Sequence, residues 1–188
     1  MEETHLKILP LFFCLILLLF SASAQALTYD FQTSLTQCNV LAPDVIFSAG
    51  TNGTAYVIST NKTRAEVNVT GTLETTYYKY VLNITNLSSS VDYQLKLEIT
   101  STNGISRLAN FTAYFHDGTT SKQVEISNGT VSQSMGSWYS VTASVTIYLS
   151  LAIKVSASGE STVDLRLHVV RSDTTSPELT QTVKINVS

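Results

Sequence analysis

The stretch Val141–Val155, VTASVTIYLSLAIKV, places an apolar residue at every odd position from end to end. Its even positions are mostly Ser, Thr, Tyr and Lys. Because successive residues of a β-strand point to opposite faces, this alternation is typical of a strand with one buried face. At roughly 3.3 Å per residue the run would span about 50 Å, which is longer than an ordinary strand. We therefore expect it either to bend across two sheets or to be split by a turn that the sequence does not mark.

Shorter segments elsewhere in the chain show the same alternation. Turn pairs such as Asn-Gly, Asp-Gly and Ser-Gly separate them, and no convincing helical pattern occurs after residue 26. The sequence therefore predicts an all-β protein with a jelly-roll-like antiparallel β-sandwich. The expected strands are Ala55–Ser59, Arg64–Leu73, Tyr77–Asn86, Tyr93–Ser101, Ala109–Phe115, Lys122–Ser127, Thr162–Val170 and Leu179–Val187.

Residues 1–26 have the layout of a secretory signal peptide. Lys7 precedes an apolar run from Ile8 to Phe20, and small residues then offer cleavage after Ala24 or Ala26. A membrane-spanning helix needs about 20 apolar residues, whereas this run is shorter and contains Pro10. We expect a secreted chain that does not insert into a membrane after cleavage.

Charge and cysteine content limit the partners of the mature chain. The formal net charge is −3, and it becomes −2 when Glu2, Glu3 and Lys7 leave with the signal peptide. The mature chain has no basic run, so we expect neither nucleic acid nor an anionic membrane surface as a partner. Cys38 remains as a single cysteine, for which a buried thiol and an intermolecular disulfide are both open.

Sequons for N-glycosylation are unusually dense. The ten Asn after residue 26 include eight in Asn-x-Ser/Thr motifs, where chance at this Ser/Thr content gives roughly three. In strand-like segments the apolar neighbours point one way and the Asn the other, and the remaining sequons lie in turn-like segments. We expect all eight to face water and to serve as glycan acceptors: Asn52, Asn61, Asn68, Asn83, Asn86, Asn110, Asn128 and Asn186.

Residues 27–37 form a candidate donor strand ahead of the sandwich domain, residues 38–188. Leu27, Tyr29, Phe31 and Leu35 share one face of this segment, and polar residues occupy the other. The segment is either the first strand of its own sandwich or a strand that completes the sheet of a neighbouring subunit. Head-to-tail donation does not close on itself, so it would produce a filament.

On these features the mature chain resembles the archaeal thread and bundling-pilus subunits, which are similar to the TasA-type biofilm fibre proteins of bacteria. The resemblance rests on the cleavable signal with the segment after it, the dense sequons, and three stretches: Ala109 through Asp117-Gly118 to Asn128-Gly129, Val141–Val155 and Thr162–Val170. It implies a jelly-roll-like sandwich polymerised by donor-strand complementation. By position, Leu27, Tyr29, Phe31 and Leu35 would be the inserted residues.

The sequence has no recognisable catalytic or cofactor motif. His116-Asp117 is the only adjacent His–carboxylate pair, and a metal shared with His168 or Asp164 has no supporting ligand spacing. Paired carboxylates are conceivable only among Glu98, Glu125 and Asp164, which sit at polar strand positions. We expect no cofactor, no metal and no enzyme activity. Trp138 with Tyr139 and Tyr148 offers a possible sugar-stacking platform, although aromatic residues of a sandwich more often pack in its core.

Two functions remain from different classes. The first is the structural subunit of a glycosylated extracellular filament at the cell surface, a thread or pilus for adhesion or biofilm formation, whose partners are further copies of itself. The second is a monomeric cell-surface glycoprotein module that binds a sugar or a protein. The first requires residues 27–35 to leave their own chain, and the second requires them to fold back on it.

Overall fold

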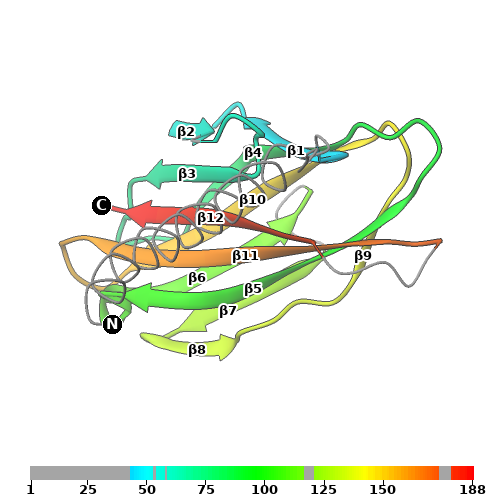
Figure 1. Cartoon of the computed structure of the whole chain (residues 1–188). Helices are drawn as coiled ribbons and strands as arrows, with labels where there is room; N and C mark the ends of the chain where they lie inside the picture. The colour runs from blue at the N-terminus through cyan, green and yellow to red at the C-terminus, as the bar shows by residue number, and fades with distance from the viewer. Residues whose placement is uncertain (1–42, 53, 58, 117–120, 174–178) are drawn as a thin grey trace, which may run out of the picture. The chain divides into compact units, whose positions relative to one another are not determined.

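The structure, a computed structural model, describes residues 43–52, 54–57, 59–116, 121–173 and 179–188. The expected signal peptide, the candidate donor strand Leu27–Leu35 and Cys38 lie outside the described residues. The described residues belong to one unit, Pro43–Ser188. The strands of this unit form two layers (Figure 1).

The first sheet has six strands in the order β1-β4-β10-β6-β7-β8, and all its pairs are antiparallel. It places the central strand β10 between β4 and β6, so the outer strands are β1 and β8. Its members are β1 (Val45–Ala49), β4 (Thr76–Asn86), β6 (Leu108–Phe115), β7 (Lys122–Ser127), β8 (Thr130–Gln133) and β10 (Thr146–Val155).

The second sheet also has six strands, in the order β2-β3-β12-β11-β5-β9. Its pairs are antiparallel except for β3 and β12, which run parallel with Asn68 opposite Asn186. Its members are β2 (Thr54–Val57), β3 (Arg64–Val69), β5 (Tyr93–Asn103), β9 (Tyr139–Val141), β11 (Ser161–Arg171) and β12 (Leu179–Val187). A short 3-10 helix, Ile105–Arg107, precedes β6.

The fold-deciding run Val141–Val155 contains both of the features expected as alternatives. Val141 ends β9 in the second sheet, and Thr146 begins β10 in the first sheet. A turn closed by the Val145 amide and the Thr142 carbonyl (3.3 Å) separates them, with Ser144 at φ 60°. The run therefore crosses between the layers, and the turn is hard to predict because it contains no Gly, Pro, Asn or Asp.

The β-sandwich expected from the sequence is confirmed. Each of the eight shorter expected segments overlaps an observed strand, and Lys122–Ser127 and Leu179–Val187 match at both ends. The sequence missed β1, where Ile46 interrupts the polar face, and β8, which is short and largely polar. It also missed the parallel pairing of β3 with β12, because period-two alternation does not encode strand direction.

The inward faces of both sheets meet in one apolar core. Phe47, Phe111 and Phe115 are its largest fully buried side chains, and all three come from the first sheet. The second sheet supplies Leu95, Leu97 and many β-branched residues. Burying an apolar side chain of this size contributes roughly 1.5–3 kcal/mol, so the packed interior supplies most of the stability of the unit.

Candidate functional site

The sequons are spread over both sheets and their turns. Asn52, Asn61, Asn68 and Asn128 are exposed, whereas Asn83, Asn110 and Asn186 are half-buried. In two of them the Thr of the motif donates its hydroxyl hydrogen to the Asn side-chain carbonyl: Thr63 to Asn61 at 2.8 Å and Thr112 to Asn110 at 3.3 Å. In both motifs the Thr hydroxyl contacts the carbonyl oxygen of the Asn, so the amide nitrogen takes no part in the bond. Occupancy by glycans stays a prediction for every sequon.

Asn86 does not face water, so the expectation of exposure was wrong at this position. Its side chain is only 1% exposed. Its Nδ2 donates to the carbonyl oxygens of Val91 at 2.8 Å and Thr142 at 3.1 Å, and its Oδ1 accepts from the Ser88 amide at 3.0 Å. The sequence places Asn86 beside a Ser-rich turn, but the residue ends β4 and ties two loops of one sandwich end together.

Other sequon amides differ in how they use their hydrogens. Asn52 Nδ2 donates to the Lys79 carbonyl at 2.6 Å, and Asn83 Nδ2 donates to the Ala49 carbonyl at 3.0 Å. Asn186 Nδ2 donates to both Glu66 and Asn68. Within the described part of the chain, the Nδ2 atoms of Asn61, Asn68, Asn110 and Asn128 donate to no protein acceptor.

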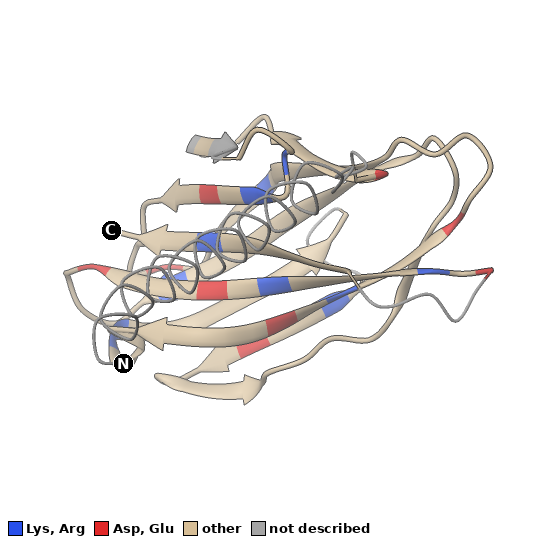
Figure 2. Cartoon of the chain, in the orientation of Figure 1, with Lys and Arg blue, Asp and Glu red and all other residues tan. Residues whose placement is uncertain are grey.

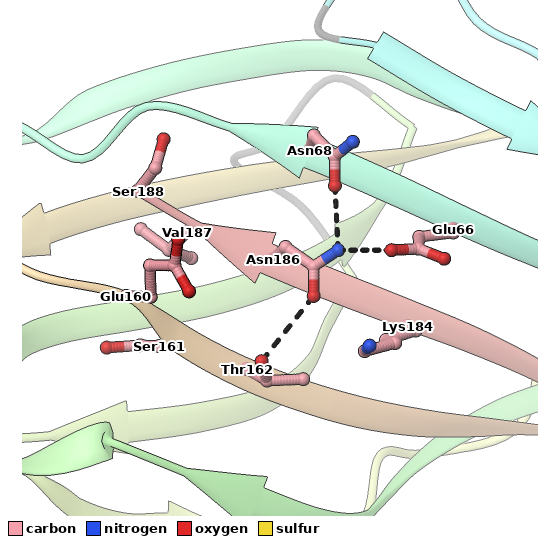
Figure 3. Close-up of a pocket in the computed structure, with 9 residues that line it drawn as sticks. All are labelled: Glu66, Asn68, Glu160, Ser161, Thr162, Lys184, Asn186, Val187 and Ser188. Carbon is pink, nitrogen blue, oxygen red and sulfur yellow. Dashed lines mark hydrogen bonds between the residues drawn. The ribbon is translucent and has the colours of Figure 1, made fainter.

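A polar depression of about 460 Å³ lies on the outer face of the second sheet, around the Asn68–Asn186 pair (Figure 3). Asn186 occupies its centre and contacts Glu66 Oε1 at 2.5 Å and Asn68 Oδ1 at 2.7 Å. Thr162 donates to Asn186 Oδ1 at 3.5 Å. Apart from Val187 the lining is polar, so this depression is unsuited to the apolar face of an inserted strand: Glu66, Asn68, Glu160, Ser161, Thr162, Lys184, Asn186, Val187 and Ser188.

Charged residues of both signs are interspersed along the strands of the second sheet, whose outer face holds the depression (Figure 2). Lys184 stands opposite Glu66 on one side and opposite Asp164 on the other. Glu98 accepts from Arg166 at 3.4 Å and lies 2.9 Å from His168 Nε2. Cross-strand pairs of opposite charge stabilise a sheet by tenths of a kcal/mol to about 1 kcal/mol each. The net charge of this face is therefore small, and it does not attract a polyanion.

Aromatic rings form a row that begins on β4 and β10 of the first sheet and ends at Tyr139 of β9 in the second sheet. The rings of Tyr80 and Tyr148 lie 4.6 Å apart, and His116 lies 6.5 Å from Tyr148 and 5.3 Å from Tyr139. This aromatic row (Tyr80, Tyr148, His116 and Tyr139) only partly matches the platform suggested by the sequence. Trp138 instead lies against the ammonium group of Lys96, at 4.2 Å from the ring centre.

Two strained backbone positions hold this row in place. Tyr80 and His116 adopt φ values of 60° and 64°, which bulky side chains rarely do. The Ser150 hydroxyl accepts from the Tyr80 amide at 3.1 Å and donates to the His116 carbonyl. Three residues of β4, Lys79–Val81, bulge opposite Ser150 as a result. Sequence patterns give no signal for such a bulge.

The residues considered for catalysis or metal binding are not brought together. His116 directly follows β6 of the first sheet and lies in the aromatic row, whereas His168 pairs with Glu98 on the second sheet. Glu125 is on β7 of the first sheet, where it pairs with Lys122 at 3.2 Å, and Asp117 is outside the described residues. Among the described residues, no group of three His, Cys, Asp or Glu side chains is placed to share a metal ion.

The two long sides of the sandwich differ in how they are closed. At the β5 side, the Ile99 amide donates to Ser134 and the Gly136 amide to Leu97, and Gln123 Oε1 accepts from the Leu97 amide at 3.2 Å. At the opposite side, the edge strands β1 and β2 of the two sheets lie against each other. The outer edge of β1 is partly used, because Phe47 donates to Lys62 and Gln181 donates to Val45.

Exposed apolar side chains are present at both ends of the sandwich. Leu87 and Leu179 are 56% and 55% exposed and lie with Val145 at the end where the described chain begins. Leu73 is 71% exposed at the opposite end. At the first end the Tyr93 hydroxyl donates to Asp44 Oδ2 at 2.6 Å. Two causes raise the pKa of Tyr93 to about 12: the larger is burial, and the next is this hydrogen bond. This bond ties Asp44, directly before β1, to the first residue of β5.

Comparisons with known proteins give only distant structural likenesses. No family model matches the chain, and no curated protein matches it. The ASH/PapD-like domain of human CEP192 is 9% identical with a TM-score of 0.45, covering 80% of this chain and 89% of that one. The CooA pilin subunit of enterotoxigenic Escherichia coli is 12% identical with a TM-score of 0.41, covering 78% and 98%.

The N-terminal domain of PorA is 18% identical with a TM-score of 0.41, covering 76% of this chain and 95% of that chain. Likenesses with TM-scores this low carry no argument, and the resemblance to archaeal threads and TasA-type proteins stays a prediction. In the part of the chain that the structure describes, no helix is long and apolar enough to cross a membrane.

Proposed function

We propose that this protein is a non-catalytic structural subunit of a glycosylated extracellular filament, polymerised head-to-tail by donor-strand complementation. The supporting observation is that the edge strands β1 and β2 lie together on one side of the sandwich, while the other side is closed by the chain itself. A strand from a neighbouring subunit would add at the β1–β2 side. Its role would be adhesion or biofilm formation at the cell surface.

The energetics of such a junction are favourable. The donor strand would bury Leu27, Tyr29, Phe31 and Leu35, at roughly 1.5–3 kcal/mol for each fully buried side chain. Ladder hydrogen bonds add about 1 kcal/mol net each. Because β2 is the outermost strand of the second sheet, its outer edge would supply backbone partners, and strand addition uses side-chain pockets to fix the register. The partners are therefore further copies of the chain and its covalent glycans, with no nucleic acid.

Electron microscopy of the mature protein beside a variant lacking residues 27–35 tests the proposal. We expect filaments from the full chain and single particles from the shortened one. A Tyr29→Asp and Phe31→Asp double variant should also stay monomeric, because it places charge on the inserted face. The matched control, Asp30→Ala with Gln32→Ala, changes only the other face and should assemble. Single particles from a folded, glycosylated full-length chain would refute the filament.

The aromatic row favours a second candidate, a monomeric module that binds saccharide. Sugar rings stack on aromatic faces, and within the described residues the Tyr80 and Tyr148 hydroxyls have no protein hydrogen-bond partner. Binding of the mature protein to immobilised neutral polysaccharides would be compared with that of Tyr148→Ala. Single particles whose saccharide binding is lost in Tyr148→Ala would favour this function. Filaments that bind no saccharide would exclude it.

A further inference from the structure

The chemistry of N-glycosylation sets a condition on the acceptor amide. The Asn nitrogen attacks the anomeric carbon of a lipid-phosphate-linked oligosaccharide, the nitrogen–carbon bond forms and the carbon–oxygen bond to phosphate breaks. One amide proton is lost, and the lipid phosphate leaves with the electrons of the broken bond. The product keeps its carbonyl oxygen but only one N–H. An Asn that needs both hydrogens for the fold therefore does not keep its contacts once modified.

Asn186 uses both of its amide hydrogens. One goes to Glu66 Oε1 and the other to Asn68 Oδ1, at 2.5 and 2.7 Å (Figure 3). The orientation of the amide follows from its surroundings, because an ionised carboxylate only accepts hydrogen bonds and a flipped amide would set oxygen against oxygen. A sugar on Nδ2 would take the position of the Glu66 carboxylate or of the Asn68 side chain.

Asn86 uses its hydrogens in the same way. Its Nδ2 faces the carbonyl oxygens of Val91 and Thr142, which only accept, and its Oδ1 faces the Ser88 amide, which only donates. At 1% exposure no space for a saccharide exists beside it. A chain modified here before folding would lose one of these bonds and carry a polar sugar between two loops.

Asn68 is the counterpart of Asn186 in the same hydrogen-bonded pair. It accepts through Oδ1, which a glycosylated Asn retains, and its Nδ2 points away from Asn186 (Figure 3). Because β3 lies between β12 and the edge strand β2, a glycan on Asn68 leaves on the side of β2. Asn61, Asn110 and Asn128 likewise keep a free Nδ2 within the described chain, and Asn52 and Asn83 each use one hydrogen.

We propose that only six of the eight sequons are glycan acceptors, and that Asn86 and Asn186 are structural amides in sequon-like sequences. The proposal rests on the glycoprotein part of the proposed function and deepens it. It pairs an acceptor, Asn68, with a non-acceptor, Asn186, across adjacent strands. The secreted, folded protein would carry glycans at most on Asn52, Asn61, Asn68, Asn83, Asn110 and Asn128.

Two surface substitutions test Asn68 and Asn186 separately, because each removes one sequon without changing the Asn itself. Thr70→Ala removes the Asn68 sequon, and Ser188→Ala removes the Asn186 sequon; both positions are exposed. The intact mass of each variant, purified from the medium or surface of the cells that make it, is compared with the native mass. We expect Thr70→Ala to lose the mass of one glycan besides the CH2O removed by the substitution, and Ser188→Ala to lose only the mass of one oxygen atom.

Site-resolved mass spectrometry of glycopeptides completes the test. A saccharide found on Asn86 or Asn186, or the loss of one glycan mass in Ser188→Ala, would overturn the proposal. Retention of the full glycan mass in Thr70→Ala would also overturn it. A native protein without saccharide on any sequon would refute both this inference and the glycoprotein part of the proposed function. Filament formation is measured separately, so a failure of polymerisation is distinguishable from a failure of the acceptor pattern.

Discussion

At the scale of single residues, the hydroxyl of Ser150 joins the backbones of two neighbouring segments by hydrogen bonds. Ser150 is 1% exposed, and its hydroxyl hydrogen-bonds the backbones of Tyr80 and His116. These two residues lie on either side of β10 and both have a left-handed backbone conformation. We predict that Ser150→Ala lowers the free energy of unfolding by about 1–3 kcal/mol, because a partly buried backbone donor and a partly buried backbone acceptor lose their shared partner together. Urea unfolding of the two proteins measures this difference.

Ser156→Ala is the matched control for that substitution. Its hydroxyl also donates to a backbone carbonyl, that of Arg107 at 3.1 Å, but Ser156 is exposed. Water replaces a lost partner at the surface, so the expected change is within about 0.5 kcal/mol. Equal effects of Ser150→Ala and Ser156→Ala would mean that the bulge is not held by Ser150.

Side-chain direction could be predicted from the sequence at several sequons, but hydrogen-bond partners could not. Alternation along β3 correctly turned Asn68 toward solvent, between the buried Val67 and Val69. The partner of Asn186 lies 118 residues away along the chain, and no periodic pattern reveals a contact of that separation. The prediction that Asn86 faces water was wrong because Asn86 is the last residue of β4. At this end of the sandwich, polar side chains are buried where they hydrogen-bond the neighbouring loops.

At the scale of elements, the junction of β1 with the β4 bulge depends on Gly50. Its amide donates to the Val81 carbonyl at 3.2 Å, and a Cβ built at Gly50 would collide with the Tyr80 carbonyl oxygen. We predict that Gly50→Ala destabilises the protein by about 1–3 kcal/mol, because backbone must move to admit the methyl group. Faster amide hydrogen exchange confined to β1 and the bulged part of β4 would locate the effect.

Thr51→Ala tests whether the effect belongs to Gly50 or to the loop in general. Thr51 is exposed, and within the described residues its side chain makes no hydrogen bond. Exchange rates in β1 should therefore match those of the native protein. Native-like stability of Gly50→Ala would show that β1 does not need this close approach.

Strand positions were predictable because alternation acts within one segment, whereas strand pairing depends on distant segments. The β11 segment was recognised from Val163, Leu165 and Leu167, which are all buried. Nothing local indicates that β12 lies between β11 and β3, or that β3 runs parallel to it. The side of the sandwich proposed to receive a neighbour's strand, formed by β1 and β2, follows from that strand order. The sequence could therefore suggest a donor strand without locating the edge that would receive it.

At the scale of the whole sandwich, the two ends are chemically suited to contact each other in a head-to-tail array. One end exposes Leu87 and Leu179, and the opposite end exposes Leu73. In the proposed filament each end would meet the other end of the next subunit, because head-to-tail contacts join two different surfaces. Exposed apolar groups at such a contact add to the strength of strand insertion.

We therefore predict that Leu87→Glu shortens the filaments without changing the melting temperature of the subunit, since surface substitutions usually alter stability by less than about 0.5 kcal/mol. Filament length is measured by electron microscopy, and subunit stability by thermal unfolding. Adding Leu73→Lys at the other end should restore length, because opposite charges would then meet across the junction. Met135→Glu, which changes an apolar side chain that is 42% exposed but lies beside β5 along the side of the sandwich, is the control and should assemble normally. Filaments of native length from Leu87→Glu would show that the ends do not touch and that strand insertion alone joins the subunits.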